Sequence, residues 1–264
     1  MTPTPTMADR LALDAIDELT FVSAEPTDRG HVFGGLLIGQ ALRAAHLTVV
    51  AGKAPHSLHA SFVEAGAPDH VVRLRVERTR DGASFATRRV VAEQDHGVVL
   101  VLTADFHAEE GGVEYEVPGT SAVPGPQGLP VGRYTSRWFD SVDVPVGSVV
   151  GGPPHARHAW FRPTAPMPDD PDLHAHALAY MSDHGPTRAA REPHAHLADD
   201  ARRMSVSLDH SVWFHRPVDV NEWLLYELQP IATGRGRGLA IGTIRTADGT
   251  LAATVAQEVL LRTR

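Results

Sequence analysis

Residues 205–217, SVSLDHSVWFHRP, bring serines, an aspartate, two histidines and an arginine into one short segment. These residue types could form a hydrolytic triad or a metal site, so the geometry of the segment matters. Read as a strand, it places Ser207, Asp209, Ser211 and Trp213 on one face and Leu208, His210, Val212 and Phe214 on the other. His210 would then point away from Ser207 and Asp209. His215 lies about 20 Å of extended strand from Asp209. The segment alone therefore makes no site, and at most it lends a group to one.

Other chemical motifs are also incomplete. A hydrolase elbow G-x-S-x-G and a zinc motif H-E-x-x-H are both absent. His174 and His176 would diverge by about 200° on a helix, so they could not bind one metal there. We expect most histidines of the clusters 155–158, 174–184 and 194–196 to be solvated. No metal site is predicted.

Arginine pairs offer sites for an anion. TGRGRG at 233–238 has strand-like flanks, which favours a hairpin turn over a dinucleotide-binding loop, and Arg235 and Arg237 could still meet a phosphate. Within FATRRVV, either Arg88 or Arg89 must face inward and needs a partner.

Two polar residues stand in apolar surroundings. Asp183 ends the apolar segment HALAYMSD, where an acid lies at the unfavourable end of a helix dipole. Gln257 lies in TLAATVAQEVLL, which is apolar on both faces. A buried Asp or Gln is either a hydrogen-bonded structural group or a catalytic one, and these residues alone leave both readings open.

Composition excludes several classes of protein. The 264 residues carry a formal net charge of −8 without a long basic run, which argues against nucleic-acid binding. No cysteine is present, so disulfides and thiolate chemistry are excluded. The N-terminal segment does not resemble a signal peptide, and no apolar run reaches about 18 residues. We expect a cytoplasmic protein that does not cross a membrane.

The pattern of hydrophobic residues predicts an α+β fold. Residues 7–19 read as a short helix, and residues 31–50 read as a buried helix on which Gly35 and Gly39 leave a bare face for another backbone. Four strand-like runs follow at 56–66, 71–79, 83–94 and 97–107. One buried helix followed by a meander of strands is typical of this class.

The second half of the chain repeats this plan after a segment without periodicity. Residues 108–133 are rich in glycine and proline and read as a linker. Beyond it, strand-like runs at 138–147 and 156–163 lead into a helix over 170–185 with Asp170 or Asp172 as its cap, and four more strands follow. A shift of 152 residues superposes Gly82 on Gly234 and Gly97 on Gly249, which indicates an internal duplication. We therefore expect repeats at 1–107 and 134–264.

In order and spacing, HVFGGLLIGQAL, HSLHASF, RDGASFATRRV, SLDHSVWFHRP and DGTLAATVAQEVLLR resemble the type II acyl-CoA thioesterases, the TesB-like double hot-dog family. The resemblance covers the chain from about residue 10 to its end. It implies two hot dogs, each a helix wrapped by an antiparallel sheet, and hydrolysis of acyl-CoA thioesters without a metal or cofactor.

The same resemblance implies a catalytic trio of Asp183, Ser207 and Gln257. Asp183 would activate a water as general base, and the other two would hold that water by hydrogen bonds. We further infer that backbone N–H groups at Gly34, Gly35 and Leu36 could stabilise an oxyanion. Arg88, Arg235 and Arg237 are candidate contacts for CoA.

The chain departs from the family at one turn and leaves two other functions open. Glu64, Ala65 and Gly66 stand where the family usually has Arg-Pro-Gly, so CoA binding at this edge is in question. A non-catalytic acyl-CoA-binding protein is one alternative. A hot-dog enoyl-CoA hydratase is another, although it needs an Asp–His dyad one helical turn apart, whereas Asp183 and His184 are adjacent. A homo-oligomer formed through the sheets is also expected.

Overall fold

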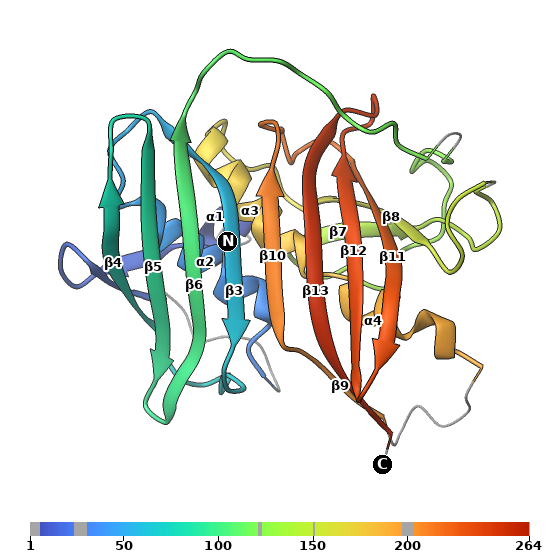
Figure 1. Ribbon diagram of the computed structural model, residues 1–264, viewed down its shortest axis with the longest axis horizontal. Helices are drawn as coiled ribbons and strands as arrows, with labels where there is room; N and C mark the ends of the chain where they lie inside the picture. The colour runs from blue at the N-terminus through green and yellow to red at the C-terminus, as the bar shows by residue number, and fades with distance from the viewer. Residues whose placement is uncertain (1–5, 24–30, 121–122, 150, 197–202, 264) are drawn as a thin grey trace, which may run out of the picture.

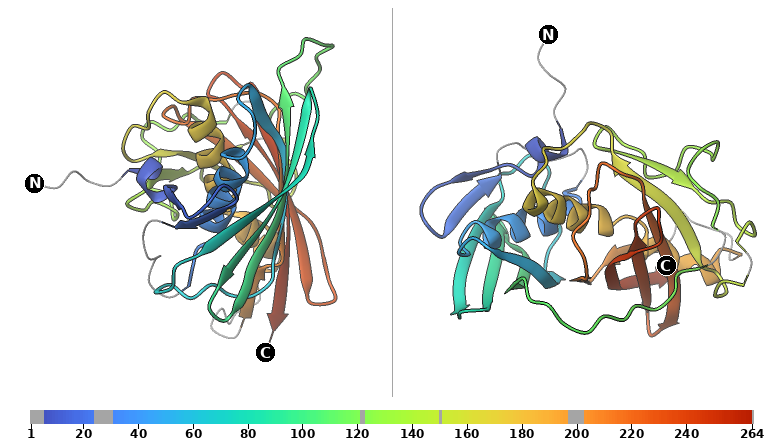
Figure 2. Two further views of the ribbon diagram at one scale, coloured as in Figure 1. Left: turned by 90° about the vertical axis from the view of Figure 1, so that its left-hand side faces the viewer. Right: turned by 90° about the horizontal axis from the view of Figure 1, so that it is seen from above.

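The computed structural model describes residues 6–23, 31–120, 123–149, 151–196 and 203–263. One long, curved antiparallel sheet forms a single layer, and the two main helices lie together on one of its faces (Figures 1 and 2). The predicted α+β class is confirmed. Within the described residues, none of the helices is long and apolar enough to span a membrane.

The helices and strands follow the predicted runs closely. The helices are α1 (Met7–Arg10), α2 (Gly34–His46), α3 (Pro171–Ser182), α4 (Pro186–Arg191) and the short 3₁₀ turn η1 (Glu192–His194). Strands of the first half are β1 (Leu13–Ala15), β2 (Thr20–Ser23), β3 (Lys53–Phe62), β4 (Arg73–Asp81), β5 (Phe85–Gln94) and β6 (Gly97–Ala108). Strands of the second half are β7 (Phe139–Asp143), β8 (Arg157–Pro163), β9 (Arg203–Ser207), β10 (Asp209–Phe214), β11 (Leu224–Gly234), β12 (Arg237–Arg245) and β13 (Leu251–Thr263).

The order of strands in the sheet is symmetric about its centre. It runs β4-β5-β6-β3 in the first half and continues β10-β13-β12-β11 in the second, so equivalent strands mirror each other. At the centre, β3 pairs with β10, and His59 stands opposite Ser211, 152 residues away. That separation equals the sequence shift, as expected if a pseudo-twofold axis passes between these two residues. The sheet order thus supports the duplication read from the sequence.

The helices α2 and α3 pack against each other on one face of the sheet (Figure 2). On α2, Leu36, Ile38 and Leu42 are fully buried, and each contributes about 1.5–3 kcal/mol by leaving water. A Cβ at Gly35 would lie 2.3 Å from the Tyr180 carbonyl oxygen of α3, and one at Gly39 would lie 3.2 Å from that of His176. The prediction that these two glycines admit another backbone is confirmed.

The predicted helix over residues 7–19 is wrong beyond Arg10. After α1 the chain forms the hairpin of β1 and β2, in which Leu13 pairs with Ser23, and β2 then extends the sheet beside β4. Asp17 closes the turn by accepting a hydrogen bond from the Leu19 backbone N–H at 2.8 Å. Pairing with an open sheet edge and this Asx turn outweigh a weak helical stripe.

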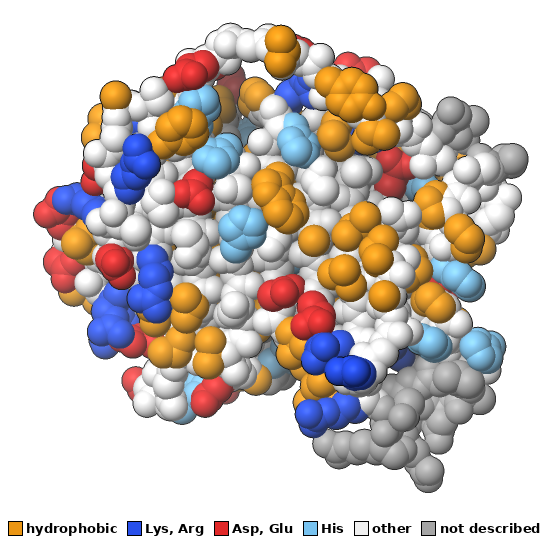
Figure 3. All heavy atoms as spheres, in the orientation of Figure 1, with side chains coloured by type: hydrophobic (Ala, Val, Ile, Leu, Met, Phe, Trp, Pro, Cys, Tyr) orange, Lys and Arg blue, Asp and Glu red, His pale blue; other side chains and the backbone are white. Residues whose placement is uncertain are grey.

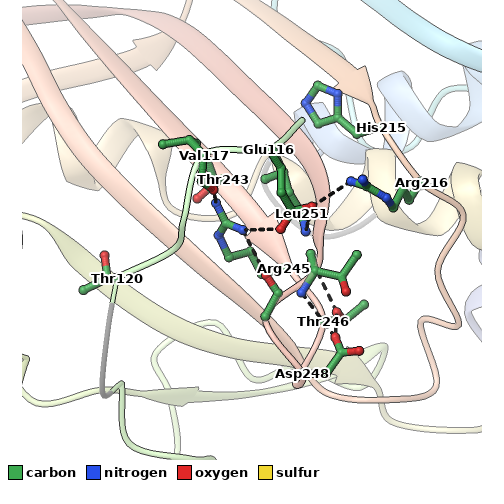
Figure 4. A network of polar contacts seen from close by, with 12 residues as sticks. Glu116, Val117, Thr120, His215, Arg216, Thr243, Arg245, Thr246, Asp248 and Leu251 are labelled. Atoms are coloured by element: carbon green, nitrogen blue, oxygen red, sulfur yellow. Dashed lines mark hydrogen bonds and ion pairs between the residues drawn. The ribbon is translucent and has the colours of Figure 1, made fainter. Parts of the chain in front are cut away.

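The segment between the repeats is held by a buried ionic network (Figure 4). Arg245, 3% exposed, donates to the Val117 carbonyl oxygen at 2.8 Å and to Glu227 at 3.2 Å. Glu116 accepts from Arg216 at 2.7 Å and lies 3.6 Å from Arg245. Burial raises the pKa of Glu227, but hydrogen bonds led by that from His158 lower it to about 2. This carboxylate therefore stabilises the fold above its ordinary pKa and stops doing so as pH falls toward 2.

We expect Arg245→Met to reduce the free energy of unfolding at pH 7 by about 3 kcal/mol, because it leaves Glu227 buried without its cationic partner. Urea denaturation followed by fluorescence measures the change. The matched control is Arg89→Met, since Arg89 pairs with Glu77 at the surface and both side chains are about half exposed. Equal losses in the two variants would contradict a special role for the network.

Candidate active site

Asp183 caps the C-terminal end of α3, a helix that begins at the N-cap Asp170, whose side chain accepts from the N–H groups of Asp172 and Leu173. The last turn is held by the Tyr226 hydroxyl, which donates to the Ser182 carbonyl oxygen at 2.7 Å. Asp183 is only 9% exposed. Among the described residues, its buried Oδ1 has no hydrogen-bond partner. Asp183 therefore has a carboxylate oxygen with an unused lone pair, and it lies at a helix end that a buried hydrogen bond holds in place.

The N-terminal end of α2 faces this carboxylate. The Gly35 backbone N–H faces Asp183 and lowers the pKa of its carboxyl, and a Cβ at Gly34 would lie 2.7 Å from Asp183 Oδ2. Any larger side chain at either glycine would push the two helices apart. Leu36 differs from the expectation, since its N–H already donates to the Phe33 carbonyl oxygen at 3.0 Å. Of the three predicted oxyanion residues, Gly34 and Gly35 thus lie against Asp183, and Leu36 has its N–H committed within the helix.

Ser207 and Gln257 come together on neighbouring strands β9 and β13. The Gln257 amide nitrogen donates to Ser207 Oγ at 2.7 Å and to Thr187 Oγ1 at 3.2 Å. The Gln257 side chain also lies close to Asp183 and lowers the pKa of that carboxyl. Gln257 is fully buried, whereas Ser207 is partly exposed. The structure therefore brings together three side chains that lie 24 and 50 residues apart along the chain.

The expectation that His210 points away from Ser207 is wrong, because the strand contains a bulge. Opposite β13, Ser207 pairs with Val259 and Ser211 with Ala256, so four residue steps on one strand match three on the other. The Asp209 carboxylate accepts from the Glu258 N–H at 2.6 Å and secures the irregular pairing. One extra residue inverts the alternation, so Ser207 before the bulge and His210 after it reach the same side.

His210 is the site residue that sequence reasoning missed. Its Nδ1 lies 2.6 Å from Gln257 Oε1 and 3.9 Å from Asp183 Oδ1, and its Nε2 lies 2.8 Å from Ser182 Oγ. The side chain is fully buried. A signal was present, because alternation placed this histidine on the apolar face with Leu208 and Val212, where a polar group needs a partner.

Burial sets the protonation of the two ionisable groups. It raises the pKa of Asp183 to about 7, against the opposing hydrogen bonds from Gly35 and Gln257. It lowers the pKa of His210 to about 4, so the imidazole is neutral at pH 7. A carboxylate with a pKa close to neutral pH is well matched to take a proton from a water. Hydroxyl and amide groups beside it are suited to hold that water.

The arginines proposed to contact an anion lie in different places. Arg88 is 1% exposed, and its guanidinium already donates to Thr48 and to Asp81 at 2.5 Å, which speaks against Arg88 as a ligand contact. The expectation that one arginine of the pair faces inward with a partner is confirmed. Arg235 occupies the turn between β11 and β12 with φ of 51°, so the predicted hairpin is confirmed.

The histidine clusters are more buried than expected. Low exposure, less than 10% in each case, is found for His158, His174 and His176. Each has a polar partner inside the fold, which offsets the cost of burying the ring. His174 bonds the carbonyl oxygens of Pro168 and Val218, while His176 meets His46 at 3.2 Å. His174 and His176 do diverge, as the helix geometry requires. No group of three or more metal-ligating side chains occurs within the part of the chain that the structure describes.

Comparison with known proteins is consistent across sequence and structure. Residues 132–260 match the family model described as acyl-CoA thioesterase, and residues 23–107 match that of the acyl-CoA thioesterase N-terminal domain. Acyl-CoA thioesterase 2 of Haemophilus influenzae is 32% identical, with 96% of this chain and 95% of that protein covered. Human acyl-coenzyme A thioesterase 8 is 31% identical, with 96% and 88% covered.

Solved structures agree in fold. An acyl-CoA thioesterase II, TesB2, from Mycobacterium marinum superposes with a TM-score of 0.88 at 36% identity and covers 98% of both chains. A conserved protein with a hot dog fold from Alicyclobacillus acidocaldarius superposes with a TM-score of 0.81 at 21% identity, covering 98% of both chains. The predicted double hot dog is confirmed.

Proposed function

Because this chain belongs to the acyl-CoA thioesterase family, we propose that it hydrolyses acyl-CoA thioesters with a water held by Asp183, Ser207 and Gln257. The observation that carries the assignment of residues is their convergence. Gln257 hydrogen-bonds Ser207 and lies close enough to Asp183 to lower its pKa, and Asp183 keeps an unpaired oxygen among the described residues. A fold held only by apolar packing would not require three polar side chains to meet here.

In the proposed reaction, ionised Asp183 accepts a proton from the water as its oxygen attacks the thioester carbonyl carbon. The C–S bond then breaks, the thiolate of CoA leaves, and the proton on Asp183 returns to that sulfur. Ser207 and Gln257 orient the water, which removes much of the entropy cost of the attack. We propose the Gly34 backbone N–H at the start of α2 as a donor to the carbonyl oxygen, where charge develops, because the Leu36 N–H bonds Phe33 and the Gly35 N–H faces Asp183.

The surroundings of His184 argue against the hydratase alternative. A hydratase would use a histidine beside the aspartate, but His184 lies among the rings of Phe33, Phe139 and Tyr180. Burial lowers its pKa to about 3, and its Nδ1 lies 3.3 Å from the Met181 carbonyl oxygen. The purely binding alternative is disfavoured by the assembled trio.

We propose that Arg237, rather than Arg88, contributes to CoA binding, with Arg235 in the adjoining turn. Arg237 lines a cavity of about 250 Å³ together with Arg191 and Arg262. Basic side chains gather on the surface at this end of β12 and β13 (Figure 3). Arg237 pairs with Glu258 at 2.8 Å, but its side chain is half exposed and, unlike the buried Arg88, can still reach a ligand. A local positive region on a chain of net charge −8 suits the phosphates of CoA.

The proposed repeats are 1–107 and 134–264, joined by a linker at 108–133. The mirrored strand order supports this division. The cytoplasmic location and the homo-oligomer stay predictions, and size-exclusion chromatography with light scattering measures the oligomer.

We expect free thiol to be released from a panel of acyl-CoAs, with kcat/KM rising with pH through about 7. The sign follows from the role of Asp183, because only the ionised carboxylate can accept the proton and its fraction rises with pH. The matched control is Asp172→Asn, on the same helix with a largely exposed carboxylate, which should keep the same profile. Binding of acyl-CoAs of every chain length without thiol release would contradict the proposed function.

A further inference from the structure

His210 is a fully buried histidine that the proposed reaction does not use as an acid or a base. It lies between Ser182 at the end of α3 and Gln257 on β13, and both ring nitrogens have polar neighbours. Two polar partners are enough to account for a buried imidazole in a folded core. His210 also lies next to the Gln257 amide, however, and can fix the direction in which that amide faces.

The hydrogen bonds around Gln257 have one arrangement that suits the site. The amide oxygen Oε1 faces His210 Nδ1 at 2.6 Å, and the amide nitrogen faces Ser207 and Thr187. Since Oε1 can only accept, Nδ1 must carry the proton, and the Nε2 of the neutral ring can then only accept. The Ser182 hydroxyl, which lies 2.8 Å from both His210 Nε2 and the Ala179 carbonyl oxygen, therefore directs its one proton to Nε2 in this arrangement. A rotated amide would turn its oxygen toward the Asp183 carboxylate, which is electrostatically unfavourable when that group is ionised.

We propose that His210 is a positioning residue for thioester hydrolysis, which holds the Gln257 amide so that its N–H groups face Ser207 and Thr187 beside Asp183. The inference rests on the proposed function, because it matters for catalysis only if Gln257 helps to hold the attacking water. His210 would act through Gln257 and would not touch the substrate.

The first repeat supplies an internal comparison. The shift of 152 residues places Leu58 at the position of His210 and Asp105 at that of Gln257. Leu58 is fully buried in β3, so this position in the fold accepts a leucine. In the repeat that lacks the trio, the positions equivalent to His210 and Gln257 thus hold neither histidine nor glutamine. A His210→Leu variant should therefore fold while losing the donor to Gln257.

The activity test compares two substitutions of His210 in two backgrounds. We expect His210→Leu to lower kcat about 10- to 100-fold with KM changed less than about threefold, because the amide loses its fixed orientation. His210→Asn should recover most of the loss, since the asparagine amide N–H can replace Nδ1–H. In a Gln257→Ala background, His210→Leu should lower kcat by less than about threefold further.

Urea midpoints of all variants separate positioning from misfolding. Three results would each overturn the proposal. These are an equal fall in kcat for His210→Leu in the wild-type and Gln257→Ala backgrounds, a His210→Asn variant as slow as His210→Leu, and wild-type kcat in His210→Leu. The predicted tautomer is tested apart from activity by ¹⁵N NMR of labelled histidine, with the His210→Leu spectrum identifying the signal. An Nε2–H tautomer overturns the assignment of His210 alone. Wild-type kcat in Gln257→Ala instead overturns the catalytic role of Gln257 in the proposed function.

Discussion

Replacing Asp183 by asparagine is expected to slow thiol release from acyl-CoA by about 10³- to 10⁴-fold, the largest loss predicted for any single substitution in this chain. Asparagine has the same shape, and its oxygen can still face the Gly35 N–H. It cannot accept a proton from water. The expected loss therefore lies in kcat rather than in KM, and steady-state kinetics with a saturating acyl-CoA measure it.

The same substitution should stabilise the fold at pH 8. Because burial raises the folded-state pKa of Asp183 to about 7, the folded protein binds more protons than the unfolded chain between about pH 4 and pH 7. Wild-type stability thus falls as pH rises through that window, by roughly 4 kcal/mol at most. The asparagine side chain carries no charge and avoids this cost. Urea denaturation of both proteins at pH 5 and pH 8 measures the difference.

These two results together distinguish a catalytic carboxylate from a structural one. A slower enzyme that is at least as stable at pH 8 supports the general base. An Asp183→Asn variant that turns over like the wild type would exclude Asp183 as the base. Asp172→Asn serves as control, since Asp172 lies on the same helix α3 near its opposite end.

Gln257→Ala is expected to lower kcat about 10²- to 10³-fold, because it removes the amide donors that face Ser207 and Thr187 beside Asp183. The substitution also leaves a cavity in the core, because the Gln257 side chain on β13 is fully buried. Some loss of stability is therefore expected, and the kinetics must be measured at a temperature well below the unfolding midpoint of the variant.

The control for Gln257→Ala is Gln127→Ala, because Gln127 lies exposed between the two repeats. Ser207→Ala should show a smaller loss than Gln257→Ala, since the serine contributes a single hydroxyl. Equal kcat for Gln257→Ala and Gln127→Ala would contradict a role of the amide in holding the water.

Local alternation was enough to predict most of the sheet. In β4, Leu74 and Val76 are buried while Arg73 and Arg75 are exposed, as a half-buried antiparallel strand requires. The N-terminal segment failed for the opposite reason. Its apolar spacing between Leu11 and Leu19 is weak, and the open edge of the sheet beside β4 decided its conformation.

The polar residues of the site could be proposed from the sequence only in part. Asp183 and Gln257 stood out because each lay in apolar surroundings, and the resemblance to a family assigned them roles. Their meeting with Ser207 depends on α3, β9 and β13 arriving at one place. Arg88 shows the limit of such reasoning. As an arginine it was a candidate contact for CoA, but its guanidinium is already bound to Thr48 and Asp81.

Periodicities along the chain were enough to predict the α+β class, the duplication and the inward-facing polar side chains. That His210 joins Ser207 on one side of the sheet could not be predicted in this way. The reason is the extra residue between β9 and β10, which the pairing with β13 and the bond from Glu258 N–H to Asp209 hold in place. Strict alternation counts residues along one strand, whereas a bulge is defined by the count on its neighbour.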